Sequence, residues 1–565
     1  MKKLFSAIAF LCISMAVLAI PANRGVYKTL TLNDGSKVRA MLVGDEHGHF
    51  WKGDDGKAYV LNGDAYQAVE IETVWEQANT RRTRMNTVLG KRLSRRKAFG
   101  ERNTYYGKKK GIIILTNFAD CQFVAEHDNA LYQRIANEKG FHEGEFIGSI
   151  ADYFKAQSFG LFELDFDVFG PVTVSHNVAY YGSDDDRRAI EMVAEAVRLV
   201  KEQVSDWTQY DWDNDGEVDQ VYVVYAGRGE SDTGIEELIW PHTYSFIWSK
   251  MGGFDIEPEE VAPGLIVNTY ACGAELKADY RIFGTGLICH EFSHCLGYPD
   301  FYPTTYSGGQ GMSYWDLMCY GCHNGGSYIP AGFTSFERWS AGWLEPVVLE
   351  EEDVTVENMQ SLQKSNECYV IYNKGNRDEY YLLENRQLEG WDAAIPSPGL
   401  LIIHVDYDHR SWVTNSPNND INHQRMTVVP ADGEYLSTLI DGSVIYDREN
   451  YKTDPFPQGE VTAFNKRFKT YDEQAKNAAR LYNANADGNY WIDSSVEQIT
   501  QNTDGTISFC FIAHDNGPDP TGIQVIDNRQ QDMDNGVYDL SGRRIPLSSV
   551  FYKGFYIKNG KKLLR

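Results

Sequence analysis

The sequence predicts an α+β protein of several domains. The chain has 565 residues, more than one core usually organises, because domains typically contain about 100–200 residues. Helical patterns alternate with short apolar runs from residue 111 to residue 345. Short strands between polar loops then fill residues 346–515, which favours a β-sandwich-like domain. A linker and a small C-terminal β module are expected at residues 516–565.

The N-terminus predicts a signal peptide over residues 1–19. Lys2 and Lys3 precede an apolar run, and small residues end at Ala19, where a signal peptidase would cut. The run is short for a membrane span, although an uncleaved anchor is the alternative. We therefore expect export, to the medium or the cell surface. Export permits disulfides among the eight remaining cysteines, but their pairing cannot be deduced from the sequence.

The overall charge argues against a nucleic-acid partner. The chain has 80 acidic and 53 basic residues, a formal net charge of −27, whereas phosphate binding needs a basic surface.

Residues 20–80 are predicted to form a β-rich pro-region. Asp-Gly pairs at 34–35 and 55–56 punctuate alternating segments, as hairpin turns do. Residues 81–110 follow as a densely basic linker. Lys91-Arg92 and Arg95-Arg96 are candidate processing sites in it, and a solvated linker that is never cut is the alternative.

A metal site is predicted in the stretch "GTGLICHEFSHCLGYPD". Its apolar residues indicate a buried helix that ends at Gly297. Positions i and i+4 share one helix face, so His290 and His294 present two imidazoles to one point. In this H-E-x-x-H arrangement the histidines bind zinc and Glu291 acts on its water. Beyond the glycine turn, Asp300 can return as a third ligand. The alternative is a buried helix with two core histidines.

The stretch "GMSYWDLMCYG" supports the same interpretation. A methionine in a tight turn after an elongated zinc motif is typical of metzincins, and Met318 fits that role. An ordinary core methionine is the alternative. Tyr320 could reach the metal or an oxyanion, or could equally be a hydrogen-bonded tyrosine without a catalytic role.

These motifs resemble the M6 family of secreted bacterial metallopeptidases, the immune inhibitor A type. "HEFSHCLGYPD", "YWDLMCYG" and "PAGFTSFERWSAGWL" carry the resemblance, which covers roughly residues 110–515. The N-terminal part is similar to pro-regions of such proteins from Bacteroidetes. The resemblance implies a metzincin-like zincin domain at residues 111–345, acting on protein or peptide substrates. It also implies the site residues: His290, His294 and Asp300 as zinc ligands, and Glu291 as general base and acid.

Four cysteines depart from the family pattern. They are Cys289 and Cys295 beside the ligands, and Cys319 and Cys322 in the methionine turn. They leave local disulfides, or interference with the site, open.

A second metal site is predicted in "DWDNDGEVD". Acidic residues alternate as in the first half of a calcium loop, with Gly216 at the sixth position. The twelfth position holds Tyr222 in place of a bidentate acid, so the loop is not a complete EF-hand. We expect a structural calcium site, and a solvated acidic turn is the alternative. The candidate ligands are Asp211, Asp213, Asp215 and Asp219.

Latency and the chain end leave alternatives open. Residues 20–110 contain no cysteine, which excludes a cysteine latch on the metal. Asp45, His47 or His49 could serve instead, or their segment is only an exposed hairpin. The C-terminal module loosely resembles sorting signals of exported proteins, and a plain β-appendage is equally compatible.

The sequence thus predicts a secreted zinc endopeptidase. The rival interpretation is a surface adhesin or glycan-binding protein whose zinc domain is inert, and the complete His290, Glu291, His294 and Asp300 set argues against it.

Overall fold

The computed structural model describes sixteen stretches of the chain. They are residues 18–22, 27–45, 48–62, 65–71, 73–74, 105–183, 186–247, 256–304, 309–434, 448–467, 476–517, 519–520, 537–538, 544–545, 555–558 and 561–564. The predicted signal peptide up to residue 17, and both candidate processing sites, lie outside these stretches.

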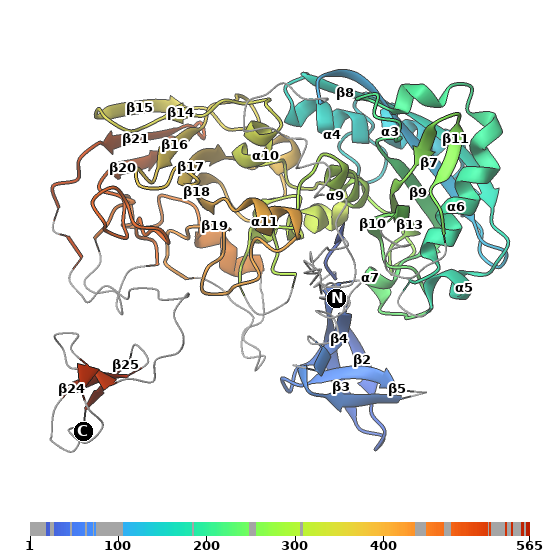
Figure 1. Ribbon diagram of the computed structural model, residues 1–565, viewed down its shortest axis with the longest axis horizontal. Helices are drawn as coiled ribbons and strands as arrows, with labels where there is room; N and C mark the ends of the chain where they lie inside the picture. Colours follow the sequence, from blue (N-terminus) through green and yellow to red (C-terminus); the bar gives the residue numbers. More distant parts are fainter. Residues whose placement is uncertain are drawn as a thin grey trace, which may run out of the picture.

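A six-stranded mixed sheet organises the middle of the chain (Figure 1). Its order is β1-β10-β13-β9-β7-β8. Strands β13, β9, β7 and β8 are parallel, whereas β10 runs antiparallel to β13 near one edge. The strands are β1 (Leu18–Ala19), β7 (Gly107–Asn117), β8 (Phe162–Thr173), β9 (Val221–Arg228), β10 (His242–Ser245) and β13 (Thr269–Leu276).

Strand β7 begins inside the stretch predicted as linker. Its first residue is Gly107, so residues 107–110 belong to the sheet. They pair in parallel with Phe162–Asp165 of β8, so the end of the basic stretch is part of a strand. The buried residues Ile112 to Leu115 follow in the same strand and enter the core.

Helices pack against this sheet. They are α3 (Asn129–Asn137), α4 (Ile150–Gln157), α5 (Val178–Gly182), α6 (Ala189–Val200), α7 (Glu230–Thr233) and α9 (Thr285–Cys295). Helix α4 starts with a capping box in which Ser149 and Asp152 satisfy each other's backbone N–H groups. Eight of the twelve residues of α6 are buried, as its apolar stripe predicts.

The N-terminal stretches form a separate antiparallel sheet in the order β2-β3-β4-β5-β6. It lies below the centre of the molecule in Figure 1, drawn in blue. Its strands are β2 (Tyr27–Thr31), β3 (Lys37–Asp45), β4 (Gly48–Gly53), β5 (Ala58–Asn62) and β6 (Ala65–Val69).

Two sheets share one apolar core in the region after residue 346. One has the order β14-β16-β17-β18-β19 and the other β15-β21-β20. Their strands are β14 (Val347–Val348), β15 (Val354–Met359), β16 (Tyr369–Tyr372), β17 (Glu379–Arg386), β18 (Gly399–Asp406), β19 (Met426–Val428), β20 (Ser495–Gln501) and β21 (Ile507–Ile512). Two short helices, α10 (Ser335–Ser340) and α11 (His409–Val413), flank the larger sheet in Figure 1.

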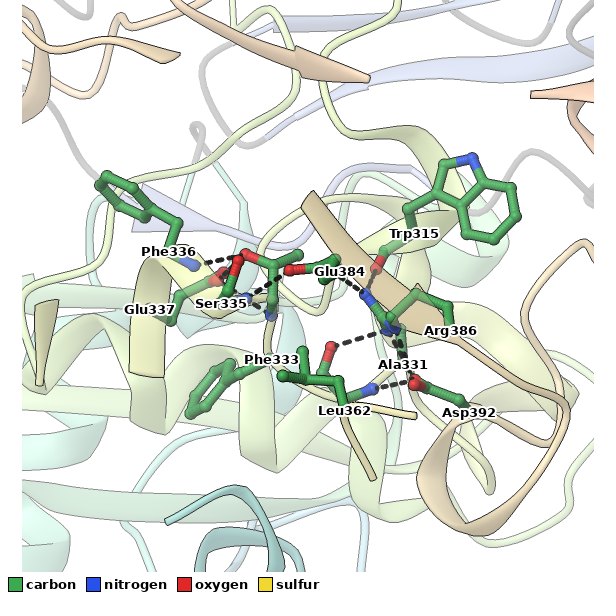
Figure 2. A network of polar contacts seen from close by, with 12 residues as sticks. Trp315, Ala331, Phe333, Ser335, Phe336, Glu337, Leu362, Glu384, Arg386 and Asp392 are labelled. Carbon is green, nitrogen blue, oxygen red and sulfur yellow. Dashed lines mark hydrogen bonds and ion pairs between the residues drawn. The ribbon is translucent and has the colours of Figure 1, made fainter. Parts of the chain in front are cut away.

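A buried ionic network joins this β-rich region to the preceding part of the chain, which contains the six-stranded sheet (Figure 2). Arg386 of β17 pairs with Glu384 at 2.9 Å and with Asp392 at 2.6 Å, and all three side chains are fully buried. Its guanidinium also donates to the carbonyl oxygens of Trp315 and Gly332, each at 3.2 Å. The two regions therefore share a desolvated polar interface.

Short strands near the C-terminus form a four-stranded sheet in the order β23-β22-β24-β25. The strands are β22 (Val537–Tyr538), β23 (Arg544–Ile545), β24 (Phe555–Lys558) and β25 (Lys561–Leu564). The mixture of helices with several sheets agrees with the predicted α+β class. None of the helices in the described part of the chain is long and apolar enough to cross a membrane.

Candidate active site

Helix α9 carries the H-E-x-x-H stretch and is buried along its whole length. Gly286 lets the helix approach the methionine turn, because a Cβ there would lie 2.1 Å from the carbonyl oxygen of Cys322. The helix ends at Cys295, and Gly297 adopts a left-handed φ of 89°. This conformation suits glycine and redirects the chain toward Asp300.

His290, His294 and Asp300 converge on one point, and all three are fully or almost fully buried. Oδ1 of Asp300 lies 3.3 Å from Nε2 of His290 and 3.6 Å from Nε2 of His294. Ligands about 2.0–2.2 Å from a tetrahedral zinc are separated by about 3.3–3.6 Å. The spacing therefore matches the edges of a zinc coordination tetrahedron.

The hydrogen bonds of the two histidines leave their Nε2 atoms available as ligands. Nδ1 of His290 donates to the carbonyl oxygen of Leu317, and Nδ1 of His294 donates to that of Tyr298, both at 2.8 Å. These donors fix the neutral tautomer with a lone pair on each Nε2. Neither Nε2 atom, nor Oδ1 of Asp300, has a hydrogen-bond partner in the described part of the chain. Orphaned buried polar atoms of this kind fit a bound cation.

Burial affects the two imidazoles differently. Burial lowers the pKa of His294 to about 4, which keeps it neutral as a ligand must be. Burial would also lower the pKa of His290, but the nearby Asp300 carboxylate and Cys322 outweigh burial and raise it well above its usual value, so a metal ion bound at Nε2 would have to displace a proton. Asp300 therefore interacts most strongly with His290.

Asn415, just after α11, fixes the aspartate. The backbone N–H of Asp300 donates to Oδ1 of Asn415 at 2.6 Å, and Nδ2 of Asn415 donates to Oδ2 of Asp300 at 2.7 Å. Asn415 lies 115 residues from its partner, and no pattern in the sequence pointed to it.

Glu291 lies between β10 and the N-terminal segment, fully buried. The hydroxyl of Thr243 donates to its Oε2 at 2.8 Å. Its Oε1 accepts a 2.9 Å hydrogen bond from the backbone nitrogen of Ile20. Both carboxylate oxygens are thus engaged, one by β10 and one by the N-terminal segment.

The N-terminal segment Leu18–Ala22 lies along the edge of the catalytic sheet. Leu18 and Ala19 pair antiparallel with Thr243 and His242 of β10. The carbonyl oxygen of Ile20 accepts from the indole nitrogen of Trp240 at 2.9 Å, and that of Pro21 contacts Nε2 of His323 at 3.0 Å. The segment therefore runs past Glu291 in an extended form.

The candidate latch residues Asp45 and His49 lie away from the candidate metal ligands. Nε2 of His49 is 3.0 Å from Glu230, and the ring stacks on Trp240 at 5.1 Å. Asp45 is buried within β3, and His47 lies outside the described residues. The histidine thus docks the N-terminal sheet beside the site, and the contact with Glu291 is made by a backbone group.

The methionine turn lies directly beside the candidate metal ligands. Met318 is fully buried, its carbonyl oxygen accepts from the N–H of Phe301 at 2.8 Å, and the preceding Leu317 binds His290. Tyr320 is buried with its ring near those of Tyr302 and Tyr314.

The eight cysteines outside the predicted leader carry thiols in the described structure. Cys289 and Cys295 are core residues, and burial raises the pKa of Cys289. Burial would likewise raise the pKa of Cys322, but the imidazoles of His323 and His290 lower it to about 7.

The acidic loop before β9 forms a second group of candidate ligands. Carboxylate oxygens of Asp211, Asp213 and Asp219 lie within 4.8 Å of one another. Asp215, which the sequence placed with them, is not in this group; its Oδ1 accepts from the backbone N–H of Glu217 at 2.9 Å. The structure therefore brings three of the four predicted carboxylates together.

Comparison with known proteins agrees with this geometry. Residues 114–346 match the catalytic domain of the family described as immune inhibitor A peptidase M6. The pre-pro-metalloprotease PrtV of Vibrio cholerae serotype O1 is 26% identical over 283 residues, which cover 42% of this chain and 29% of PrtV. Immune inhibitor A of Bacillus thuringiensis subsp. alesti is 23% identical over 298 residues, covering 43% and 42%. The chain thus spans less than half the length of these curated relatives.

Proposed function

We propose that this protein is a zinc-dependent endopeptidase that hydrolyses peptide bonds in protein substrates, since residues 114–346 match the catalytic domain of the M6 peptidase family. The observation that carries the proposal is the buried convergence of His290, His294 and Asp300 beside Glu291. Three protein ligands and one open position are typical of catalytic zinc sites, whereas structural sites use four.

Each residue then has a distinct role. His290, His294 and Asp300 would hold the ion, and their Nδ1 and Oδ2 hydrogen bonds would keep the ligand atoms aimed at it. When bound, zinc supplies a Lewis acid that lowers the pKa of a water and polarises the peptide carbonyl. Glu291 accepts a proton from the attacking water and delivers it to the leaving amine. Thr243 orients Glu291 by donating to its second oxygen.

The N-terminal segment supports a latent form. Ile20 and Pro21 lie where a substrate backbone would pass, and the Ile20 nitrogen occupies the carboxylate that must receive a proton. If the leader is cut after Ala19, as the sequence predicts, this nitrogen becomes the terminal amino group. We therefore propose that the protein is exported as a zymogen whose own N-terminus blocks the site.

The acidic loop supports a structural calcium site. Asp211 accepts from the backbone N–H groups of Asp215 and Gly216, which folds the loop so that Asp213 and Asp219 face it. Oxygen-only ligands of this kind suit Ca²⁺. The thermal midpoint should fall when EGTA is added and recover with excess Ca²⁺; a midpoint unchanged by EGTA would contradict the assignment.

Casein zymography tests the peptidase proposal against the adhesin alternative. Bands of clearing that 1,10-phenanthroline abolishes and Zn²⁺ restores are expected from the processed protein. Purified, zinc-loaded protein that has lost its N-terminal segment and still clears no casein would favour the binding-protein interpretation.

A further inference from the structure

We propose that Asn415, which lies outside the 114–346 catalytic domain, is a positioning residue of the metal centre. It would hold Asp300 in its ligating orientation and so make the β-rich region a working part of the site. The inference rests on the proposed zinc-peptidase function and deepens it.

The two hydrogen bonds determine how Asn415 must be oriented. The N–H of Asp300 can only donate, so it must face the amide oxygen of Asn415, at 2.6 Å. The amide NH₂ group then faces Oδ2 of Asp300, at 2.7 Å. This leaves Oδ1 of Asp300, without a hydrogen-bond partner among the described residues, directed at the histidines. The amide therefore selects which carboxylate oxygen meets the metal.

The backbone of Asn415 is adapted to this task. Its φ of 51° lies in the left-handed region, which most residues avoid and asparagine tolerates. The side chain is buried, and the carbonyl oxygen of Asn415 accepts from the hydroxyl of Thr304 at 3.1 Å. Uncommon backbone conformations that the surroundings hold in place cluster at functional sites.

Neighbouring asparagines hold the same stretch of chain. Nδ2 of Asn418 donates to the carbonyl oxygen of Phe301 at 2.8 Å and to that of Met426 in β19 at 2.7 Å. Asn419 contacts the hydroxyl of Thr304 at 3.0 Å. The segment that directly follows Asp300 is thus also tied to the β-rich region, through the stretch between α11 and β19.

Loss of the two hydrogen bonds between Asn415 and Asp300 should weaken metal binding specifically. Removing an outer partner of a metal ligand typically lowers affinity about 10–100-fold, because the ligand gains freedom and alternative orientations. Nothing else in the described surroundings of Asp300 supplies both a donor to Oδ2 and an acceptor for its N–H.

Asn415→Gly tests the proposal in the full exported chain. Glycine accepts the positive φ without strain, so the variant removes the amide and spares the backbone. The matched control is Asn358→Gly, an exposed asparagine of β15 whose φ is 58°. Zinc affinity is measured by competition with a chromophoric chelator, and the d–d absorption spectrum is recorded after Co²⁺ loading.

We expect Asn415→Gly to bind zinc about 10–100-fold more weakly and to show shifted Co²⁺ bands, since Asp300 would change its direction at the metal. The control should match the wild type in both measurements. Equal melting of the metal-free proteins would show that the fold is intact. Zinc affinity and Co²⁺ bands unchanged in Asn415→Gly, with normal zinc binding by the wild type, would overturn this inference alone. Absence of zinc binding by the wild type would overturn the proposed function with it.

Discussion

The backbone nitrogen of Ile20 lies 2.9 Å from Oε1 of Glu291, and both residues are fully buried. Ile20 is held there by its own carbonyl, which Trp240 binds, and the next residue contacts His323. The sheet that follows docks nearby, where Gly234 lies so close to Trp51 that a Cβ would come within 2.5 Å of the indole. The proposed base is therefore occupied by the chain itself.

Ile20→Asp should release this segment. The substitution places a carboxylate in a fully buried apolar position next to Glu291, and burying an unpaired charge is strongly unfavourable. Loss of the buried isoleucine alone is worth about 1.5–3 kcal/mol, so the initial rate of the uncleaved chain on a fluorogenic peptide should rise at least about tenfold. The control is Leu61→Asp, which adds the same charge at a half-exposed leucine of β5. Equal rates for wild type, Ile20→Asp and Leu61→Asp would argue against the latent form.

Thr243→Val should slow catalysis and leave the metal bound. Valine suits the β10 position but cannot donate to Oε2 of Glu291. Hydrogen bonds to charged groups contribute about 1.5–3 kcal/mol, which corresponds to a fall in kcat/KM of about 10–100-fold. Zinc content by atomic absorption should be unchanged. Thr500→Val, at an exposed position of β20, is the control, and a Thr243→Val enzyme as fast as this control would remove Thr243 from the mechanism.

Arg386→Met should destabilise the junction of the two regions. The substitution leaves the buried carboxylates of Glu384 and Asp392 without their cation, and breaking a buried ion pair usually costs about 3–5 kcal/mol of stability. The exposed pair of Arg377 with Glu350 supplies the contrast, because Arg377→Met should cost less than about 1 kcal/mol. Urea unfolding followed by tryptophan fluorescence measures both; similar losses in the two variants would contradict the account of Figure 2.

Asp454→Asn should change how stability depends on pH. Burial raises the pKa of Asp454 well above its usual value, although the indole N–H of Trp315 donates to Oδ2 and opposes this. A folded pKa above the unfolded value of about 3.9 gives stability that is complete at lower pH and is lost as pH rises through the folded pKa. Asparagine can still accept from Trp315 and has no such loss.

The thermal midpoint of Asp454→Asn should therefore exceed that of the wild type more at pH 8 than at pH 5. Asp487→Asn, at an exposed aspartate, should show no such trend. If the difference in thermal midpoint between Asp454→Asn and the wild type is the same at pH 5 and pH 8, the raised pKa of Asp454 is contradicted.

Local residue spacing was enough to predict that the three candidate metal ligands lie close together. His290 and His294 are four residues apart on one helix, and one glycine turn returns Asp300, so helix periodicity alone brings them together. Asn415 was not predictable, because its position depends on how a distant β region packs against the site. Helices and buried strands were predictable for the same reason as the ligands, since their periodicity is local.

The segment over the site escaped prediction for a different reason. The sequence offers side chains able to bind a metal, His49 among them, but the contact with Glu291 uses a backbone N–H that every residue except proline carries. Such a contact requires no particular residue type, so it cannot be recognised from the sequence. Alternating acids predict a calcium loop without showing which carboxylates converge, and Asp215 does not lie in the group formed by the other three candidates.

The most direct test of the central claim is the activity and zinc content of Glu291→Gln. The amide keeps the shape of the side chain but cannot take up a proton, whereas His290, His294 and Asp300 remain to hold the metal. The account predicts full zinc content with peptide hydrolysis reduced by at least about 10²-fold, while Glu202→Gln, at an exposed position, retains wild-type activity. Zinc-loaded Glu291→Gln protein that cleaves peptide as fast as the wild type would contradict it.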